Sequence, residues 1–219
     1  APQDHFVEPT KEYFVNFRQF CTTALLLVPL TSFSRGPVGI GNLEIGMSRT
    51  AVEGLAADDG VHLSSPLTPY ESKYDEAKPD EDKFNAMLAT PFSKDSLKAI
   101  LTFSNGSLKS IYLNLGNSSI ILDQVKEMIA AKYGQPKIDN SIKEEQCIYK
   151  GGANFKVSSG SLRYHWSQDR ANAEPILVSL SDTIIDTCPS DLRYATAAIQ
   201  SRNLNIRVAE PAKPVVNPF

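Results

Sequence analysis

The residue types best suited to catalysis are few in this chain, and the most favourable pair is His165 with Asp169. An imidazole can act as a general base when a carboxylate orients it, and an acidic loop residue would complete a hydrolytic site. However, Leu162, Tyr164 and Trp166 alternate along a predicted strand, which places His165 on the opposite face. We therefore expect a solvated histidine and no enzymatic activity. A periplasmic hydrolase built on His165 and Asp169 is the alternative.

Sequence motifs of known catalytic, cofactor-binding and metal sites do not occur. The chain has no GxSxG elbow, no HExxH, no Walker loop and no GxGxxG in a strand-to-helix context. His5, His62 and His165 lack the spacing of metal ligands, and the cysteines form no CxxC pair. The acidic cluster from Asp75 to Asp82 lacks the alternating ligands and the glycine of a calcium loop. We expect no catalytic residue, no cofactor and no metal.

Three aromatic residues are the candidates for a binding surface. Tyr112 falls on the polar side of its predicted strand, and Tyr164 and Trp166 share one side of another. Large amphipathic rings supply contact area in protein interfaces at a small entropic cost. The sequence therefore predicts a protein-binding surface that includes Tyr112, Tyr164 and Trp166. Burial of Tyr164 and Trp166 in the core is an equally good interpretation.

The cysteines indicate a structural disulfide and an oxidising compartment. Cys147 begins one short strand-like stretch and Cys188 ends another, so a bond between them would join the last predicted strand to a neighbour. Disulfides persist in exported proteins, which predicts a periplasmic or secreted location. The alternative is a cytosolic protein with two reduced core cysteines. Cys21 lies in an apolar stretch and is expected to be an inert buried thiol.

Composition and charge restrict the partners. The 22 basic and 25 acidic residues give a net charge of -3, so no global positive field would hold nucleic acid. The apolar run from Cys21 to Leu30 is shorter than the roughly 20 residues of a membrane span. Residues 13–34 can be read as a buried helix or as a signal-like segment. We expect another protein as the partner, and neither nucleic acid nor a transmembrane segment.

The elements that must position these residues form an α+β pattern. Asn105-Gly106 between two alternating runs predicts a β-hairpin. Ser48 predicts the cap of a helix ending near Gly60, and a second helix is predicted at Ile121–Tyr133. Further strands are predicted at 147–150, 154–157, 161–166 and 176–181, with a turn at 158–161. We expect an antiparallel sheet with helices packed on one face.

The predicted organisation has three parts. An N-terminal helix and linker occupy residues 1–36, a single α+β domain residues 37–208, and an extended tail residues 209–219. Two helix ends, Leu55-Ala-Ala-Asp-Asp-Gly60 and Ile129-Ala-Ala-Lys-Tyr-Gly134, align at an offset of 74 residues. They suggest a tandem helix-plus-hairpin repeat at 41–115 and 116–188, although chance similarity explains them equally well.

Two short segments resemble a known group of exported bacterial proteins. The stretch Ile45-Gly-Met-Ser-Arg-Thr-Ala-Val52 resembles the helix start of SmpA/OmlA-type envelope lipoproteins and of the β-lactamase inhibitor protein, and Lys132-Tyr-Gly-Gln-Pro136 resembles a helix ending in related proteins. The resemblance implies helices on one face of an antiparallel sheet, sometimes as a tandem repeat, and protein binding as the activity. This chain has no lipobox cysteine at its N-terminus, and its N-terminal helix and acidic segment are additional.

These observations lead to a hypothesis of function. We expect an exported bacterial protein-binding domain, acting either as an envelope assembly or scaffold factor or as an inhibitor or immunity protein. The alternatives are the hydrolase described above and a carrier of a small ligand or lipid, which would need an apolar cavity beneath the sheet.

Overall fold

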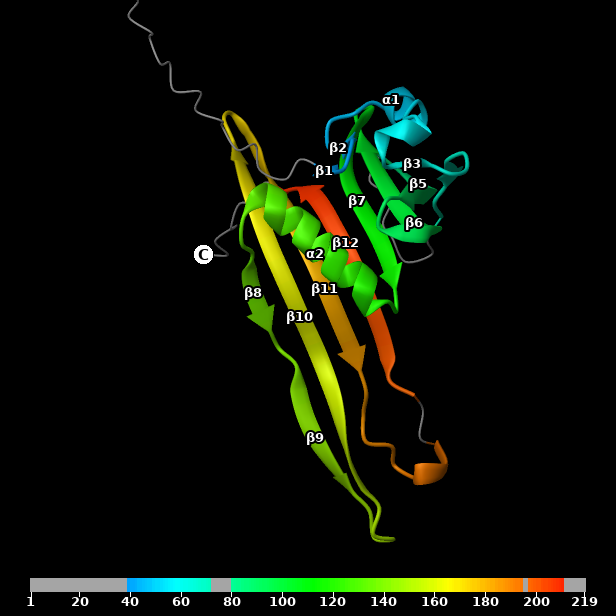
Figure 1. The fold of residues 1–219 in the computed structure, drawn as a ribbon, viewed down its shortest axis with the longest axis vertical. Helices are drawn as coiled ribbons and strands as arrows, with labels where there is room; N and C mark the ends of the chain where they lie inside the picture. Colours follow the sequence, from blue (N-terminus) through cyan, green and yellow to red (C-terminus); the bar gives the residue numbers. More distant parts are fainter. Residues whose placement is uncertain (1–38, 72–79, 195–196, 211–219) are drawn as a thin grey trace, which may run out of the picture. The chain divides into compact units, whose positions relative to one another are not determined.

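The computed structural model describes residues 39–71, 80–194 and 197–210 (Figure 1). All of them belong to one compact unit, Ser34–Phe219. The helix expected within residues 13–34, the tail beyond residue 210 and residues 72–79 of the acidic segment lie outside the described residues. The predicted domain boundaries therefore stay predictions.

A ten-stranded antiparallel sheet dominates the described unit. Its strands follow the order β3-β5-β6-β7-β12-β11-β10-β8, with β4 paired to β5 and β9 paired to β10. Their bounds are β3 His62–Leu63, β4 Thr68–Pro69, β5 Glu81–Thr90, β6 Ser93–Ser104, β7 Ser107–Gly116, β8 Lys137–Asn140, β9 Lys143–Ile148, β10 Asn154–Arg170, β11 Ala173–Ile185 and β12 Ile199–Val208. A separate two-stranded ribbon joins β1 (Gly39–Ile40) to β2 (Leu43–Glu44).

The predicted fold class is wrong, because the structure is mostly antiparallel sheet. Strands make up 57% of it and helices 15%. The described residues contain two α-helices, the single-turn α1 (Arg49–Glu53) and the longer α2 (Ser119–Tyr133), besides the short 3-10 turns Ala57–Asp59 and Leu192–Tyr194. The first predicted helix should have continued to Gly60, but Gly54 caps it six residues earlier. Two long strands, β5 and β12, were not predicted.

From each edge of the sheet to its centre, the strands lie in the order in which they occur along the chain. Helix α1 precedes β3, β5, β6 and β7, and helix α2 precedes β8, β10, β11 and β12. The last long strands of these two sets, β7 and β12, pair at the centre. The unit thus contains two halves of matching topology, the second of which extends to Val208. A duplication within the sequence stays a prediction.

One face of the sheet is buried under α2, which lies over β10, β11 and β12 in Figure 1. The inward residues of α2 are Leu122, Val125 and Ile129, all at most 5% exposed. They belong to the same cluster as the alternating apolar side chains of the central strands. Burying a side chain of this size contributes about 1.5 to 3 kcal/mol, so this face holds the unit together.

Capping residues fix where both helices begin and end. Ser48 and Ser118 accept hydrogen bonds from the backbone amides of Ala51 and Ile121, at 3.1 and 3.3 Å. Gly134 ends α2 with a φ of 87°, a value that favours glycine. The two segments that resemble known proteins therefore contain helix boundaries, with Ser48 in one and Gly134 in the other.

The hairpin at Asn105-Gly106 is confirmed. It joins β6 to β7, and φ is 51° at Asn105 and 73° at Gly106. Ile111, Leu113 and Leu115 are at most 1% exposed, as the alternation predicts.

We expect Gly106→Val to destabilise the protein by about 1 kcal/mol or more, because a β-branched residue is strained at positive φ. Chemical denaturation monitored by circular dichroism would measure the loss. Gly151→Val is the matched control, since Gly151 is also a turn glycine with open space around it but has no positive φ. Equal midpoints for the two variants would contradict the turn assignment.

The turn predicted at 158–161 is wrong, because β10 continues through it from Asn154 to Arg170. What changes there is the neighbouring strand, since β9 pairs with the first part of β10 and β8 with the second. Gly160 permits the change, because a Cβ at this position would collide with the carbonyl oxygen of Ser141. The small polar residues that suggested a turn therefore accommodate a close backbone approach.

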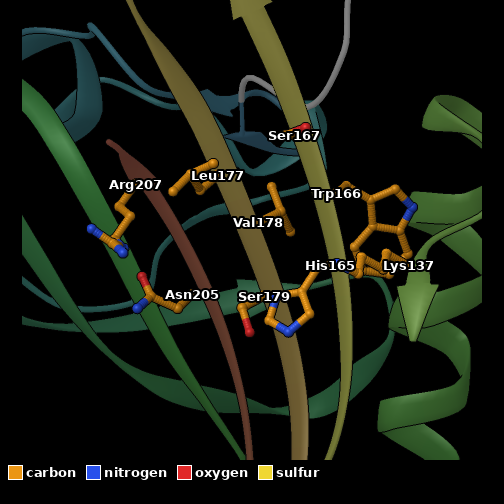
Figure 2. A pocket seen from close by; sticks show the side chains of 9 residues that line it. All are labelled: Lys137, His165, Trp166, Ser167, Leu177, Val178, Ser179, Asn205 and Arg207. Atoms are coloured by element: carbon orange, nitrogen blue, oxygen red, sulfur yellow. The ribbon is translucent and has the colours of Figure 1, made fainter. Parts of the chain in front are cut away.

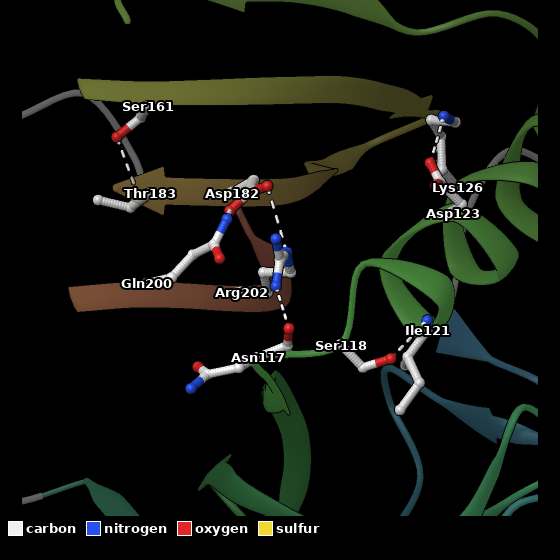
Figure 3. A network of polar contacts seen from close by, with 10 residues as sticks. All are labelled: Asn117, Ser118, Ile121, Asp123, Lys126, Ser161, Asp182, Thr183, Gln200 and Arg202. Carbon is white, nitrogen blue, oxygen red and sulfur yellow. Dashed lines mark hydrogen bonds and ion pairs between the residues drawn. The ribbon is translucent and has the colours of Figure 1, made fainter. Parts of the chain in front are cut away.

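A buried ion pair ties the start of α2 to the sheet (Figure 3). The Arg202 guanidinium, 5% exposed, lies 3.2 Å from the Asp182 carboxylate. It also donates to the carbonyl oxygen of Asn117, just before the Ser118 cap. Gln200 donates a further hydrogen bond to Asp182. These contacts fix the connection between β7 and α2, where the two halves of the unit meet.

Candidate functional site

The three aromatic candidates do not share a surface. Trp166 is 6% exposed and packs in the core beneath α2, where its Nε1 donates to the carbonyl oxygen of Gly134 at 2.9 Å. Tyr164 is half-buried on the same side of the sheet. Tyr112 points to the opposite side, because it alternates with the buried Ile111 and Leu113. The structure thus separates Tyr112 from the other two.

Helix α2 contacts Tyr164 as well as Trp166. The amine of Lys126 lies 5.5 Å from the centre of the Tyr164 ring. The same amine donates to Asp123 at 2.8 Å, and this hydrogen bond raises the pKa of Lys126. A protonated lysine above an aromatic ring is a favourable arrangement. Tyr164 therefore contributes to the attachment of α2.

The side of the sheet that carries Tyr112 is not covered by any described helix or strand, and we name it the open face. Its centre is a continuous cross-strand row through seven strands. The row consists of Asn85, Ile100, Tyr112, Asn205, Ser179, His165 and Lys137. Rows on either side of it add Met87, Lys98, Asn114, Asn203, Ser181, Arg163 and Asp139, and Lys83, Thr102, Ser110, Arg207, Leu177 and Ser167.

The chemistry of the open face is polar with a basic bias. Hydroxyl and amide side chains dominate it, and Ile100, Tyr112 and Leu177 are half-buried among them. Its three rows carry five cations and one carboxylate, Asp139, which gives a net charge of +4 with His165 neutral. The whole chain has a net charge of -3. Positive charge is therefore concentrated on this face.

A pocket of about 390 Å³ lies in the open face (Figure 2). Lys137 and His165 line it from β8 and β10, and Asn205 and Arg207 line it from β12. Leu177 contributes an apolar side chain from β11, beside which Ser179 offers a hydroxyl group. Trp166 and Val178 also line it, so the strands place apolar residues and several hydrogen-bonding groups around one hollow.

The hydrolytic pair considered from the sequence is not assembled. His165 and Asp169 are four residues apart on β10, which corresponds to roughly 13 Å along a strand. Asp169 is not among the residues that line the pocket, although His165 is. Within the part of the chain that the structure describes, no three His, Cys, Asp or Glu side chains gather as metal ligands would.

The predicted disulfide between Cys147 and Cys188 is confirmed. Their Cα atoms lie 5.5 Å apart, and the bond closes a sequence separation of 41 residues. Nearby, the Tyr149 hydroxyl donates to the carbonyl oxygen of Pro189 at 2.6 Å, and its ring stacks on Phe155. The disulfide therefore belongs to a packed connection between β9 and the segment after β11.

Comparisons with known proteins identify no relative. The chain matches no protein-family profile, no curated protein and no solved structure. The resemblance to SmpA/OmlA-type proteins and to the β-lactamase inhibitor protein therefore stays a prediction. Among the described helices, none has the length and apolar character that a membrane span requires.

Sequence reasoning missed the residues that β12 contributes to the open face, namely Asn203, Asn205 and Arg207. A signal was present, because apolar and polar residues alternate in Arg202-Asn-Leu-Asn-Ile-Arg207. The buried members, Leu204 and Ile206, are at most 1% exposed. Only two apolar residues mark the alternation, so the pattern is weak without its neighbouring strands.

Proposed function

We propose that this chain is an exported bacterial protein-binding domain and that the open face is its binding surface. The observation that carries the proposal is a broad sheet with one face buried under α2 and the other not covered by any described element. The open face places a tyrosine among amide and hydroxyl groups, and tyrosine is enriched at the centres of protein interfaces. Such a surface offers contact area and hydrogen bonds together.

The disulfide supports the export part of the proposal. Cys147 is 2% exposed and bonded to Cys188, so the bond is part of the folded structure. Structural disulfides form in oxidising compartments, which favours a periplasmic or secreted location. An assembly or scaffold role and an inhibitor or immunity role would both use the open face. The identity of the bound protein would distinguish these roles.

A site-specific cross-linking experiment tests the surface. A photoreactive phenylalanine at position 112 would report on the open face, and the same residue in place of the exposed Glu127 would report on α2. Each variant is exposed to an envelope extract, and the linked proteins are identified by mass spectrometry. We expect one protein to be linked from position 112 and not from position 127. Linkage from position 127 alone would contradict the proposal.

With that protein in hand, we expect Tyr112→Ala to weaken binding by about 30-fold or more, the loss typical of an interface anchor. Isothermal titration calorimetry would measure it. Tyr164→Ala is the matched control, because Tyr164 is a half-buried tyrosine on the other side of the sheet. Equal weakening by the two folded variants would mean that the open face is not the binding surface.

A further inference from the structure

The pocket in the open face has the composition of an anion-binding site. Arg207, Lys137 and His165 surround it, and Ser179 and Asn205 add groups that can donate hydrogen bonds (Figure 2). No carboxylate is among the described residues that line it. Arginine and lysine form their strongest hydrogen bonds with carboxylate and phosphate oxygens. The charges and donors of the pocket therefore favour an acidic group.

The two cations of the pocket form no ion pair with the described residues. Neither Arg207 nor Lys137 has an ion-pair partner there, and both side chains are exposed. The Oδ1 atom of Asn205 is buried without a hydrogen-bond partner among the described residues. This oxygen is an acceptor and would not bind a carboxylate, so the group of Asn205 that an anion would use is its NH2 donor.

We propose that this pocket binds an aspartate or glutamate side chain of the partner, so that the partner presents an acidic protein segment to the open face. This proposal rests on the proposed function. Arg207 and Lys137 flank the incoming carboxylate from β12 and β8, and Ser179 and Asn205 lie between them on the sheet. Leu177 contacts the methylene groups of the same side chain.

The distribution of charge supports a protein with an acidic segment as the occupant. The three central rows of the open face carry +4 in a chain of net charge -3, so opposite charges on a partner would accelerate association and fix its orientation. The open face of a second copy would bring cations against cations. Arg207 also lines a neighbouring hollow of about 420 Å³, in which Glu81 and Glu174 accompany Lys83 and Lys109. The acidic group is therefore expected at the pocket itself.

A defined peptide tests the pocket without knowledge of the partner. The probe is a hexaglutamate peptide with blocked termini, and amide chemical shifts of the isotope-labelled protein report where it binds. We expect saturable shifts at His165, Ser179, Asn205 and Arg207, and none with hexaglutamine. Shifts confined to other parts of the protein would overturn the inference. Sodium glutarate is the free-anion control, and equal affinity for glutarate would show that the pocket takes a small anion and not a protein segment.

Charge-reversal variants give the second arm. We expect Arg207→Glu and Lys137→Glu each to weaken hexaglutamate binding about tenfold or more at 0.15 M salt, whereas Arg207→Lys retains most of it. Lys150→Glu changes the net charge equally in an exposed turn. Its position lies before β10, roughly 35 Å along the strand from His165, beyond the range of screened charges. Equal weakening by Lys150→Glu would mean non-specific attraction and would overturn the inference.

The same variants separate this inference from the proposed function when they are applied to the cross-linked protein. If position 112 still links that protein with full yield in Arg207→Glu and Lys137→Glu, the open face binds a partner and the carboxylate pocket is wrong. If position 112 links no protein while hexaglutamate binds as expected, the pocket binds acidic peptide and the proposed function fails. If reversal reduces both measurements, both proposals are supported. Dimerisation through the open face, seen by sedimentation, would overturn the acidic partner.

Discussion

Replacing Trp166 with alanine should destabilise the protein by about 3 to 5 kcal/mol, because it removes the largest side chain beneath α2. Trp166 is 6% exposed, and its indole holds the end of α2 through the hydrogen bond to Gly134. The substitution removes that hydrogen bond and leaves a cavity. Urea denaturation followed by circular dichroism is the suitable measurement, since Trp166 is the single tryptophan and fluorescence would lose its reporter.

Two controls separate these effects of Trp166→Ala. Trp166→Phe retains much of the volume but not the indole donor, so its loss of stability should be clearly smaller. Tyr112→Ala changes a half-buried aromatic residue on the opposite side of the sheet and should cost less still. If Trp166→Ala and Tyr112→Ala destabilised the protein equally, Trp166 would not be the core residue described here.

Removing the disulfide by the double substitution of Cys147 and Cys188 with alanine should cost about 4 kcal/mol. The chain-entropy estimate for a loop of this size gives this value, because the uncrosslinked unfolded chain gains conformational freedom. Denaturation midpoints of the native protein with and without a reductant, and of the double variant, would measure the effect. Reductant should lower the midpoint of the native protein and leave the double variant unchanged. Identical midpoints in all four conditions would contradict a stabilising bond.

The position of Trp166 also affects how the binding experiments are interpreted. Trp166 lies on the α2 side of the sheet although it lines the pocket, so a loss of binding in Trp166→Ala would reflect displacement of β10 or unfolding. Tyr112 and Arg207 are on the open face, where changes act on binding with little loss of core packing. Interpreting any loss of binding therefore requires a folded variant.

Local features of the chain were predictable because their causes are local. The Asn105-Gly106 turn needs positive φ at both residues, and Asn-Gly is the pair that adopts it most readily. Ser48 begins α1 through its own hydroxyl, and Gly134 with Pro136 ends α2. The alternation around Tyr112 established which side of β7 would be buried. The disulfide was predictable because two of three cysteines lie at the ends of strand-like stretches.

The sheet itself was not predictable to the same degree. The sequence of β5 begins with three charged residues, and that of β12 has two apolar residues that mark its buried side, so the strand pattern of each is weak. β12 becomes a strand because two long neighbours, β7 and β11, supply its backbone hydrogen bonds, and β5 because it pairs along its length with β6 and at its other edge with the short strands β3 and β4. Without these strands the expected helical content was too high. The turn predicted at Gly160 was also wrong because of a long-range contact, since the glycine there allows the backbone of Ser141 to approach closely.

The sequence by itself determined the ends of α2, the central hairpin, the disulfide and the face to which each residue of a recognised strand points, since each depends on a few neighbouring residues. Only the tertiary structure decided which faces are covered. It placed Tyr164 and Trp166 beneath α2 and left Tyr112 on the open face, because the position of one helix on the sheet is set by long-range packing. It also brought Lys137, His165 and Arg207 into one pocket, since strand order joins residues that are far apart along the chain.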